Sequence, residues 1–388
     1  MIIARQMEQA IRSMLSKFPM LLVTGPRQAG KTTLLREMFA DYRYVNLEFA
    51  ANRAFASEDP VGFLRQYSGK VILDEAQRVP ELFSYLQVRA DEDREMGKYI
   101  LSGSQNFLLA DSVAQSLAGR VAIFKLLPLS HREMLENQPS LLYEQLEKVL
   151  FYGGYPALFE RNIDPSAYFP SYLETYLERD VRSVANIADL GTFRNFLKLC
   201  AGRVGQTLNY QSLAVEAGIS QPTLKKWLNI LEAGFVAFTM QPYFENFSKR
   251  LVKSPKLYFY DTGLLCHLLD LNEANQIEHY HARGSLFENM VAAELMKNRF
   301  NDFRPASIYF WRDSNGNEVD FLVREGGNIN LIEAKYSFTP TAQFFKGIRF
   351  VRASAPDSKG SNVVVYAGTE HQRRTDGEML PWKQVYEL

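Results

Sequence analysis

The stretch Gly-Pro-Arg-Gln-Ala-Gly-Lys-Thr at residues 25–32 decides the fold class. It matches the pattern G-x-x-x-x-G-K-[ST], whose glycines let the backbone curl so that its amides face phosphate oxygens. An apolar run at residues 20–24 predicts a strand before it, and residues 32–39 predict a helix after it. The start of that helix would direct its positive dipole end at the phosphates. The sequence therefore predicts an ATP-binding loop between a strand and a helix.

Two side chains of this loop are expected to make specific contacts with ATP and Mg²⁺. Lys31 would reach the β- and γ-phosphates, and the Thr32 hydroxyl would be a ligand of Mg²⁺. The full set of residues expected to bind the nucleotide is Gly25, Pro26, Arg27, Gln28, Ala29, Gly30, Lys31, Thr32 and Thr33.

A second motif, Val-Ile-Leu-Asp-Glu at residues 71–75, supplies the carboxylates of a hydrolytic site. Asp74 ends an apolar strand and is expected to hold Mg²⁺, commonly through water. Glu75 follows at the place where a general base polarises the attacking water. This pairing is typical of hydrolases and disfavours a small-molecule kinase. The alternative, a glycine-rich turn and a buried strand with an acidic surface end, does not explain why both motifs occur in order and in matching contexts.

Short apolar runs alternate with amphipathic segments in the first third of the chain. The predicted strands are 20–24, 44–47, 71–73, 99–101 and 121–124, and the predicted helices between them include 32–39, 81–90 and 107–117. Such a βαβ series predicts a parallel sheet with helices on both faces. After Pro128 the strand pattern stops, and residues 132–158 and 172–187 predict a helical lid or connector.

The composition is that of an ordinary globular protein. The 388 residues include 44 Lys and Arg against 44 Asp and Glu, so a strongly basic surface overall is excluded, although local basic patches are not. Cys200 and Cys266 are the only cysteines, which excludes a disulfide framework and a zinc site of four thiolates. The first residues carry a charge early and no apolar run of about 18 residues is visible, so we expect a cytoplasmic protein without a membrane segment.

The region after residue 191 predicts a DNA-reading unit. Residues 210–231 predict a helix, a glycine-bearing turn and a second helix with Ser220 as its N-cap, which is a helix-turn-helix. A wing is predicted from the apolar stretches 235–240 and 257–260 and from the basic residues between them, Lys249, Arg250 and Lys253. In DNA readers the second helix enters the major groove, and the residues expected at its exposed start are Gln221, Thr223, Lys225 and Lys226. The alternative is a small domain that packs on the ATPase and touches no nucleic acid.

Four residues near the C-terminus form the pattern of a metal-dependent nuclease. A predicted helix at residues 286–295 carries Glu288, and a predicted strand at 318–323 carries Asp320. The next strand places Glu333 and Lys335 on one face because side chains alternate along a strand. Carboxylates in this arrangement hold Mg²⁺ against a scissile phosphate, and a lysine orients or activates water.

This set resembles the restriction-endonuclease-like fold, with one departure, because Val319 stands where a proline often precedes the first Asp. The alternative is that Glu-x-Lys is a solvated strand face on a fold that does not cleave.

Nearly the whole chain resembles a known family, the bacterial and archaeal AAA-type ATPases that carry a C-terminal nuclease-like region, often labelled a domain of unknown function. The segments that carry this resemblance are 25–33, 73–77, 101–104, 118–120 with 128–130, 153–156 and 174–180. The resemblance implies a sensor of the γ-phosphate at Ser104, with Ser102 and Gln105 nearby. It also implies that Arg120 stabilises transition-state charge, in the same subunit or in a neighbouring one.

Two alternatives stay open among these segments. Arg120 can equally be an ordinary surface arginine or a helix C-terminal cap. Residues 153–156, Gly-Gly-Tyr-Pro, form either a tight turn that touches the nucleotide base or a helix stop.

The expected architecture is an α/β protein with several domains. The predicted domains are a P-loop ATPase core at 1–130, a helical lid or connector at 131–190, a winged-helix domain at 191–265 and a nuclease-like α/β domain at 280–388. The leading hypothesis is an ATPase whose cycle controls binding or processing of double-stranded DNA. The competing hypothesis is a slow nucleotide-gated switch or scaffold that recruits a protein partner and carries an inactive nuclease-like domain. A homo-oligomer is expected only if Arg120 acts in trans.

Overall fold

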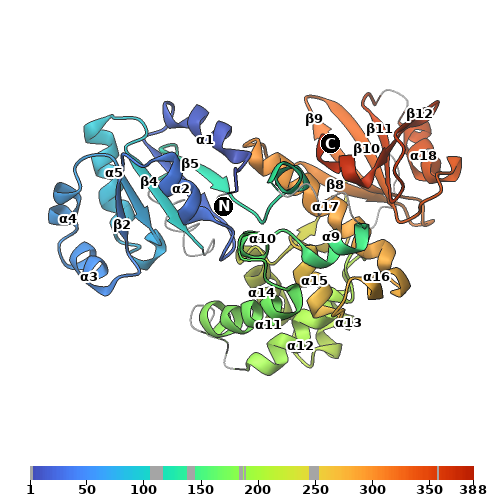
Figure 1. Cartoon of the computed structure of the whole chain (residues 1–388), viewed down its shortest axis with the longest axis horizontal. Coiled ribbons are helices and arrows are strands. Elements are labelled where there is room, and N and C mark those ends of the chain that lie inside the picture. The colour runs from blue at the N-terminus through green and yellow to red at the C-terminus, as the bar shows by residue number, and fades with distance from the viewer. Residues whose placement is uncertain are drawn as a thin grey trace.

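The computed structural model describes residues 3–104, 117–137, 145–182, 187, 189–243, 253–355 and 358–388. In Figure 1 the N-terminal sheet and its helices form a lobe on the left, a mostly helical region lies at the bottom, and a second sheet lies at the upper right. The long helix α17, Arg283–Asn301, lies between these parts and contacts β5, β7 and β10. No described helix combines the length and the apolar character that a membrane crossing requires.

The N-terminal lobe is a parallel sheet of five strands in the order β2-β3-β4-β1-β5. The strands are β1 Met20–Thr24, β2 Arg43–Asn46, β3 Val71–Asp74, β4 Tyr99–Gly103 and β5 Val121–Lys125. The predicted parallel sheet is therefore confirmed. Because β4 lies between β1 and β3, the loops that follow these three strands meet at one edge of the sheet.

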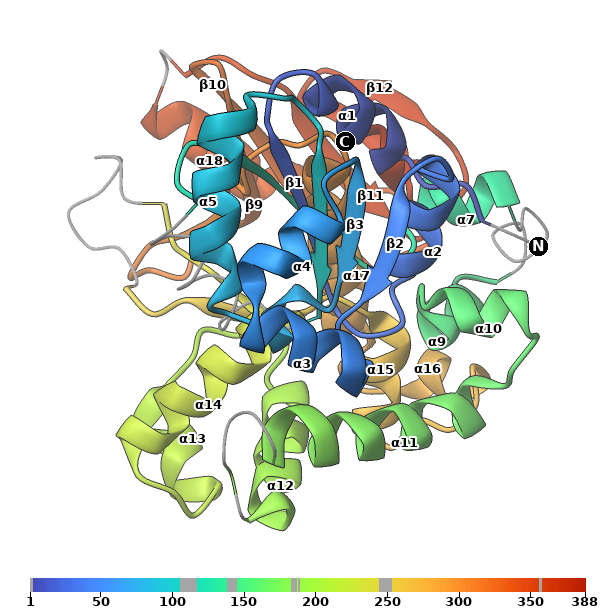
Figure 2. The same ribbon diagram turned by 90° about the vertical axis from the view of Figure 1, so that its left-hand side faces the viewer.

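Helices cover both faces of this sheet (Figure 2). Leu21, Val23 and Ile100 pack on one side with α1 and α2, whereas Leu22, Leu73 and Leu101 pack on the other with α3, α4 and α5. The helices are α1 Met7–Leu15, α2 Lys31–Met38, α3 Ala50–Glu58, α4 Pro60–Gln66 and α5 Leu82–Asp93, with a 3-10 turn, η1, at Ala76–Arg78. The predicted helix at 107–117 falls almost entirely outside the described residues.

The connector is more broken than its pattern predicts. The expected helix at 132–158 is three helices in its described parts, α7 His131–Asn137, α9 Leu146–Tyr152 and α10 Pro156–Glu160. Gly153 ends α9 with φ +66°, which an L side chain rarely adopts, and the Gly154 amide donates to Asp261 at 2.7 Å. Residues 153–156 are therefore a helix stop that is held by a distant carboxylate. The second predicted helix begins earlier, as α11 Pro165–Tyr176, because Asp164 caps it, and it continues as a π-helical segment, η2, at Leu177–Arg182.

The middle region has the helices and strands that its pattern predicts. Its elements are α12 Leu190–Ala201, α13 Tyr210–Glu216, α14 Gln221–Ala233, β6 Ala237–Met240, β7 Lys256–Phe259, α15 Thr262–Leu268 and α16 Asn275–His279. The Ser220 hydroxyl caps α14 by accepting from the Thr223 amide at 3.2 Å. Strands β6 and β7 pair antiparallel, whereas Lys249 and Arg250 of the predicted wing lie outside the described residues.

The C-terminal part is a mixed sheet of six strands in the order β12-β13-β11-β10-β9-β8. The strands are β8 Ile308–Arg312, β9 Glu318–Glu325, β10 Asn328–Lys335, β11 Asn362–Tyr366, β12 Gln372–Arg374 and β13 Gly377–Pro381. Its short helices are η3 Ala342–Phe345, α18 Lys346–Ser354 and η4 Trp382–Glu387. β8, β9 and β10 form an antiparallel meander, and α18 then leads to β11, which is parallel to β10.

Candidate nucleotide-binding site

The predicted phosphate loop has the backbone shape that its glycines suggest. Gly25 has φ +153°, and a Cβ placed there would lie 2.0 Å from the Leu126 carbonyl oxygen, so only glycine fits. Gly30 has φ +91° and stands at the N-cap of α2. The loop therefore leaves the end of β1 and enters a helix N-terminus, as phosphate binding requires.

Lys31 lies inside the curl of the loop. Its ammonium donates to the carbonyl oxygens of Gly25 at 2.9 Å and of Pro26 at 2.7 Å. Burial lowers the pKa of Lys31 to about 8, although Glu75 and Asp74 raise it. A phosphate bound in the loop would supply a negatively charged partner for this buried ammonium.

Asp74 sits at the centre of a hydroxyl cluster at the end of β3. Its carboxylate accepts from Thr32 Oγ1 at 3.0 Å, from Tyr44 OH at 2.5 Å and from Ser102 Oγ. The two expected Mg²⁺ ligands, Thr32 and Asp74, are thus adjacent, and their oxygen donors are those that Mg²⁺ prefers. The residues present fit the ion. Tyr44 was missed by the sequence reasoning because the partner strand of β3 is set only by the fold.

Glu75 is held in a strained and specific position. Its φ of +57° is uncommon for a residue with a side chain, and Gln77 Nε2 donates to its carboxylate at 2.6 Å. Ser104 Oγ is 3.5 Å from the same carboxylate, at the limit of a hydrogen bond. The structure therefore brings Ser104 to Glu75 at the sheet edge, whereas Gln105 lies outside the described residues. The role of Ser104 as a sensor of the γ-phosphate stays a prediction.

Arg120 is not at this site in the same subunit. Its carbonyl accepts from the amide of Met20, the first residue of β1, so it lies at the edge opposite the phosphate loop. A strand of this length separates the two edges by about 16 Å. The Arg120 guanidinium instead pairs with Asp91 at 2.6 and 2.8 Å. The expectation of a role in cis is wrong for this reason, and a role in trans stays a prediction.

Two loop side chains tie the site to the connector, a feature that the sequence reasoning did not assign. Arg27 donates to both carboxylate oxygens of Asp180 at 2.7 to 2.9 Å. Gln28 Oε1 accepts from Tyr168 OH at 2.9 Å. The segment that holds Asp180 carries part of the family resemblance, but nothing in the chain order indicates that it reaches the loop.

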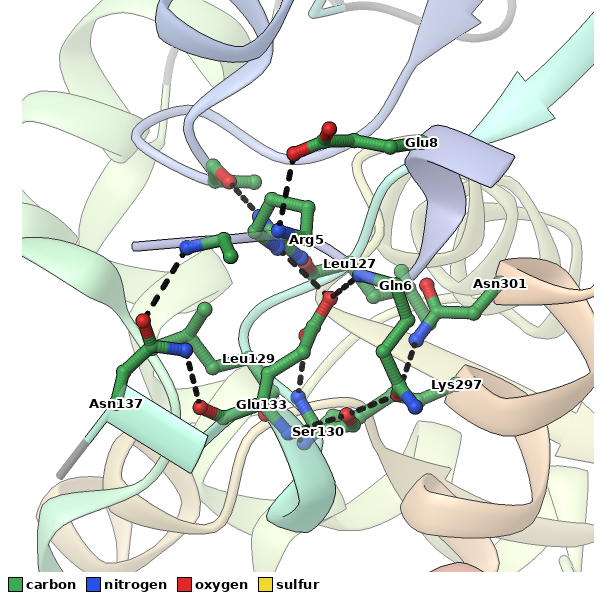
Figure 3. Close-up of polar contacts among 12 residues, drawn as sticks. Arg5, Gln6, Glu8, Leu127, Leu129, Ser130, Glu133, Asn137, Lys297 and Asn301 are labelled. Carbon is green, nitrogen blue, oxygen red and sulfur yellow. Dashed lines mark hydrogen bonds and ion pairs between the residues drawn. The ribbon is translucent and has the colours of Figure 1, made fainter. Parts of the chain in front are cut away.

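A buried cluster beneath the loop fixes its position from behind (Figure 3). Arg5 donates to the Ala29 carbonyl at 2.7 Å, to the Leu127 carbonyl at 2.7 Å and to Glu133 at 3.0 Å. The Ser130 amide also donates to Glu133, at 2.8 Å. One N-terminal arginine therefore joins the phosphate loop to the segment that follows β5.

The C-terminal residues only partly assemble as predicted. Lys335 Nζ lies 3.1 Å from Asp320 Oδ2 and 2.5 Å from Glu333 Oε2, so these three side chains do meet. Burial and the neighbouring Asp320 charge raise the pKa of Glu333.

The Glu288 carboxylate is engaged by side chains of the middle region. Its Oε1 accepts from Lys256 Nζ of β7 at 2.8 Å and from Tyr258 OH at 2.6 Å. Lys256 is almost fully buried and also pairs with Glu318. Burial would lower the pKa of Lys256, but Glu288 and Asp320 raise it. Lys256, Glu288, Glu318 and Asp320 line one cavity of about 590 Å³.

These contacts correct the predicted nuclease metal set. Within the ranges that the structure describes, no three His, Cys, Asp or Glu side chains converge closely enough to hold a metal ion. Glu288 does not join Asp320 and Glu333 as a ligand because the Lys256 ammonium occupies its carboxylate. The residues therefore do not fit the predicted three-carboxylate Mg²⁺ site.

The start of α14 presents the predicted DNA-contacting residues unevenly. Gln221, Lys225 and Lys226 are exposed. Lys225 also lies over the Tyr210 ring at 5.7 Å. Thr223 is half-buried and its hydroxyl and amide both contact Ser220, so its first task is to cap the helix. Contact with DNA stays a prediction.

Sequence comparisons assign the N-terminal lobe. The profile of an AAA domain matches residues 17–135. Two domains of unknown function, DUF8612 and DUF4143, match residues 143–275 and 283–385. Uncharacterized proteins of Mycobacterium tuberculosis (Rv2008c) and Mycobacterium bovis (Mb2031c) are each 30% identical over 366 residues, covering 93% of this chain and 79% of theirs. The chain belongs to the family of these mycobacterial proteins.

A solved structure, the Walker-type ATPase PABY2304 of Pyrococcus abyssi, aligns at 17% identity with a TM-score of 0.46, covering 69% of this chain and 96% of that one. The AAA match contains the whole phosphate loop together with Asp74 and Glu75. Residues 17–135 are therefore an AAA-type P-loop domain, and the resemblance inferred from the motifs is confirmed for this part. The C-terminal part of the chain matches only a domain whose function is unknown.

Proposed function

We propose that the chain hydrolyses Mg²⁺-ATP at the carboxyl edge of its parallel sheet. The observation that carries this proposal is the 3.0 Å contact between Thr32 Oγ1 and Asp74 Oδ2, with Lys31 inside the loop and Glu75 one residue further. This arrangement puts a phosphate cradle, a pair of metal ligands and a general base at one edge.

Each residue has a distinct task in this mechanism. Lys31 and the loop amides bind the β- and γ-phosphates, while Thr32 and Asp74 would hold Mg²⁺, which neutralises charge that develops on the phosphates. Glu75, fixed by Gln77, orients the attacking water and accepts its proton.

Nucleotide binding tests the cradle directly. Lys31→Ala should weaken binding of a fluorescent ATP analogue by at least about 100-fold, because it removes a buried charge-assisted contact with phosphate. Lys70→Ala is the control, since exposed Lys70 directly precedes β3, at the end of that strand away from Asp74, and its ammonium lies over the Tyr42 ring. Equal affinity of Lys31→Ala and wild type would place the nucleotide elsewhere.

We further propose that the ATPase cycle acts on double-stranded DNA through a winged-helix unit formed by α12 to β7. The support is the helix-turn-helix order, the antiparallel strand pair and the exposed Lys225 and Lys226 at the start of α14. The competing possibility is a protein partner on the same surface.

Salt-dependent DNA binding separates these two proposals. Changing Lys225 and Lys226 to Glu should weaken binding of a DNA duplex at low salt and lower the slope of affinity against salt concentration by about 2, one unit for each phosphate contact. Changing the exposed Lys17 and Lys70 of the N-terminal lobe to Glu is the matched control outside the winged-helix unit. Binding that is absent in wild type, or unaffected by the double change, contradicts the DNA role.

For the C-terminal domain we propose a nuclease-like fold that does not cleave. The order α17, β8, β9, β10, α18 and β11 is that of restriction-endonuclease-like folds, but Lys256 engages the carboxylate that a metal would need. We expect no nicking of supercoiled DNA in Mg²⁺ or Mn²⁺. Nicking that disappears in Asp320→Ala would overturn this proposal.

A further inference from the structure

The Arg27–Asp180 pair is a two-pronged, largely buried polar link between the phosphate loop and η2. Both ends of the guanidinium fork contact the carboxylate, with three contacts of 2.7 to 2.9 Å. The side chains are only 17% and 13% exposed, so water screens the pair weakly. Burial disfavours the charge on Arg27, but the hydrogen bond and charge of Asp180 outweigh it and raise the pKa of the guanidinium.

Arg27 also lies in the phosphate loop, and its charge acts on Lys31. It follows Pro26, whose carbonyl accepts from the Lys31 ammonium at 2.7 Å, and Lys31 is the side chain that reaches the terminal phosphates. Burial is the main cause that lowers the pKa of Lys31. The charge of Arg27 lowers this pKa further, whereas the charge of Asp180 raises it, so the three charges lie within reach of one another. Glu75 in turn raises the pKa of Arg27.

Asp180 lies on an element that leads away from the site. It belongs to the π-helical segment η2, which continues α11 and contacts α12 of the middle region. π-helical turns are rare and often occur at functional positions. The same α11 carries Tyr168, whose hydroxyl bonds Gln28, so two consecutive loop residues hold one helical unit.

We propose that Arg27 is a phosphate-contacting residue that exchanges Asp180 for the γ-phosphate of ATP, and that this exchange moves η2 and α12. The inference rests on the proposed ATPase function and adds a route from the nucleotide to the middle region. A guanidinium binds a phosphate with the same two-pronged geometry as a carboxylate, so the exchange conserves its hydrogen bonds. ADP lacks the γ-phosphate and leaves Arg27 on Asp180.

This exchange differs from a purely structural ion pair in its effect on the preference for ATP over ADP. A structural ion pair stabilises the fold equally in all nucleotide states, so breaking it changes stability alone. A ligand can shift an equilibrium only by its differential affinity for the two states. The ratio of ADP to ATP dissociation constants is therefore the quantity that separates the two accounts.

The experiment measures binding of fluorescent ATP and ADP analogues to the full chain and to variants. Arg27→Met should lower the preference for ATP over ADP by about tenfold, the equivalent of one charge-assisted contact, and Arg27→Lys should restore part of it. Asp180→Asn should raise that preference because the competitor of the γ-phosphate is weakened. Asp91→Asn weakens another two-pronged Arg–Asp pair, with Arg120 at the opposite sheet edge, and should leave the preference unchanged.

If the preference for ATP over ADP is unchanged in both Arg27→Met and Asp180→Asn, while thermal stability falls, the exchange is overturned and the pair is purely structural. If Asp180→Asn does not fold, the two Arg27 variants decide alone. Lys31→Ala distinguishes a failure of the Arg27 exchange from a failure of the ATP site. Loss of all nucleotide binding in that variant with no effect at Arg27 refutes the exchange only, whereas unchanged binding in Lys31→Ala refutes the ATP site itself.

Discussion

At the scale of single residues, the site depends on backbone shapes and buried contacts that few side chains permit. Gly25 fits where any Cβ would meet the Leu126 carbonyl, and Glu75 adopts a left-handed φ beside Gln77. The motif predicted the role of both residues. It could not predict Tyr44 on Asp74 or Arg5 on Ala29, because those contacts join positions far apart in the chain.

Gly25→Ala should abolish ATP binding and destabilise the protein. The added methyl group meets the Leu126 carbonyl at 2.0 Å, and the backbone must also hold a strained φ that costs about 1–3 kcal/mol. Gly119→Ala is the matched control, since Gly119 has φ +76° and nothing within 4 Å of an added Cβ. Nucleotide titration and urea unfolding measure both effects. Equal losses in the two variants would show that strain alone, and not the contact at Leu126, governs Gly25.

A buried histidine at the junction of the lobes predicts acid sensitivity. Burial lowers the pKa of His131, Lys297 lowers it further and Glu294 opposes them, while Trp382 packs against the ring. Because the unfolded chain takes up a proton below about pH 6.5 more readily than the folded chain, stability present above that pH is lost as pH falls.

His131→Gln should therefore lose less thermal stability than wild type between about pH 7.5 and pH 5.5. Exposed His281→Gln serves as the control and should follow wild type. Parallel curves for all three proteins would mean that His131 does not contribute to the acid sensitivity.

At the scale of elements, the sequence predicted what repeats locally and missed what is joined over distance. The strands β1, β3 and β4 of the parallel sheet are fully buried, mostly apolar runs that can be read from the chain. The expected helix at 132–158 failed because Gly153 and Gly154 turn the backbone and Asp261 fixes the turn, 107 residues further along the chain. The nuclease set failed at Glu288 because β7 brings Lys256 to it, which no local pattern indicates.

The contact between β7 and α17 should behave as a coupled buried pair. Lys256→Met leaves Glu288 without this partner and should lower the free energy of unfolding by about 3–5 kcal/mol. Adding Glu288→Gln in the same chain should restore most of that loss, because the second change removes the stranded charge. Urea unfolding of both single variants and the double variant measures the coupling. Losses that simply add would contradict a direct pair.

At the scale of the whole molecule, the parts are arranged so that the nucleotide site can influence both other regions. Arg5 joins the phosphate loop to Glu133. Helix α17 holds the same segment after β5, because Glu294 accepts from the His131 amide and Lys297 donates to the Leu129 carbonyl. Arg27 and Gln28 join the loop to α11 and η2 on the other side. A change at the γ-phosphate therefore has two structural routes outward, consistent with an ATPase that serves as a switch for its other domains.

The most direct test of the central claim is steady-state ATP hydrolysis with Mg²⁺, compared between wild type and Glu75→Gln, with nucleotide binding measured on the same samples. Glu75→Gln should bind ATP at least as tightly as wild type but turn it over at least about 100-fold more slowly, since it loses the general base alone. Turnover by Glu75→Gln at the wild-type rate would contradict the assignment of this sheet edge as the hydrolytic site.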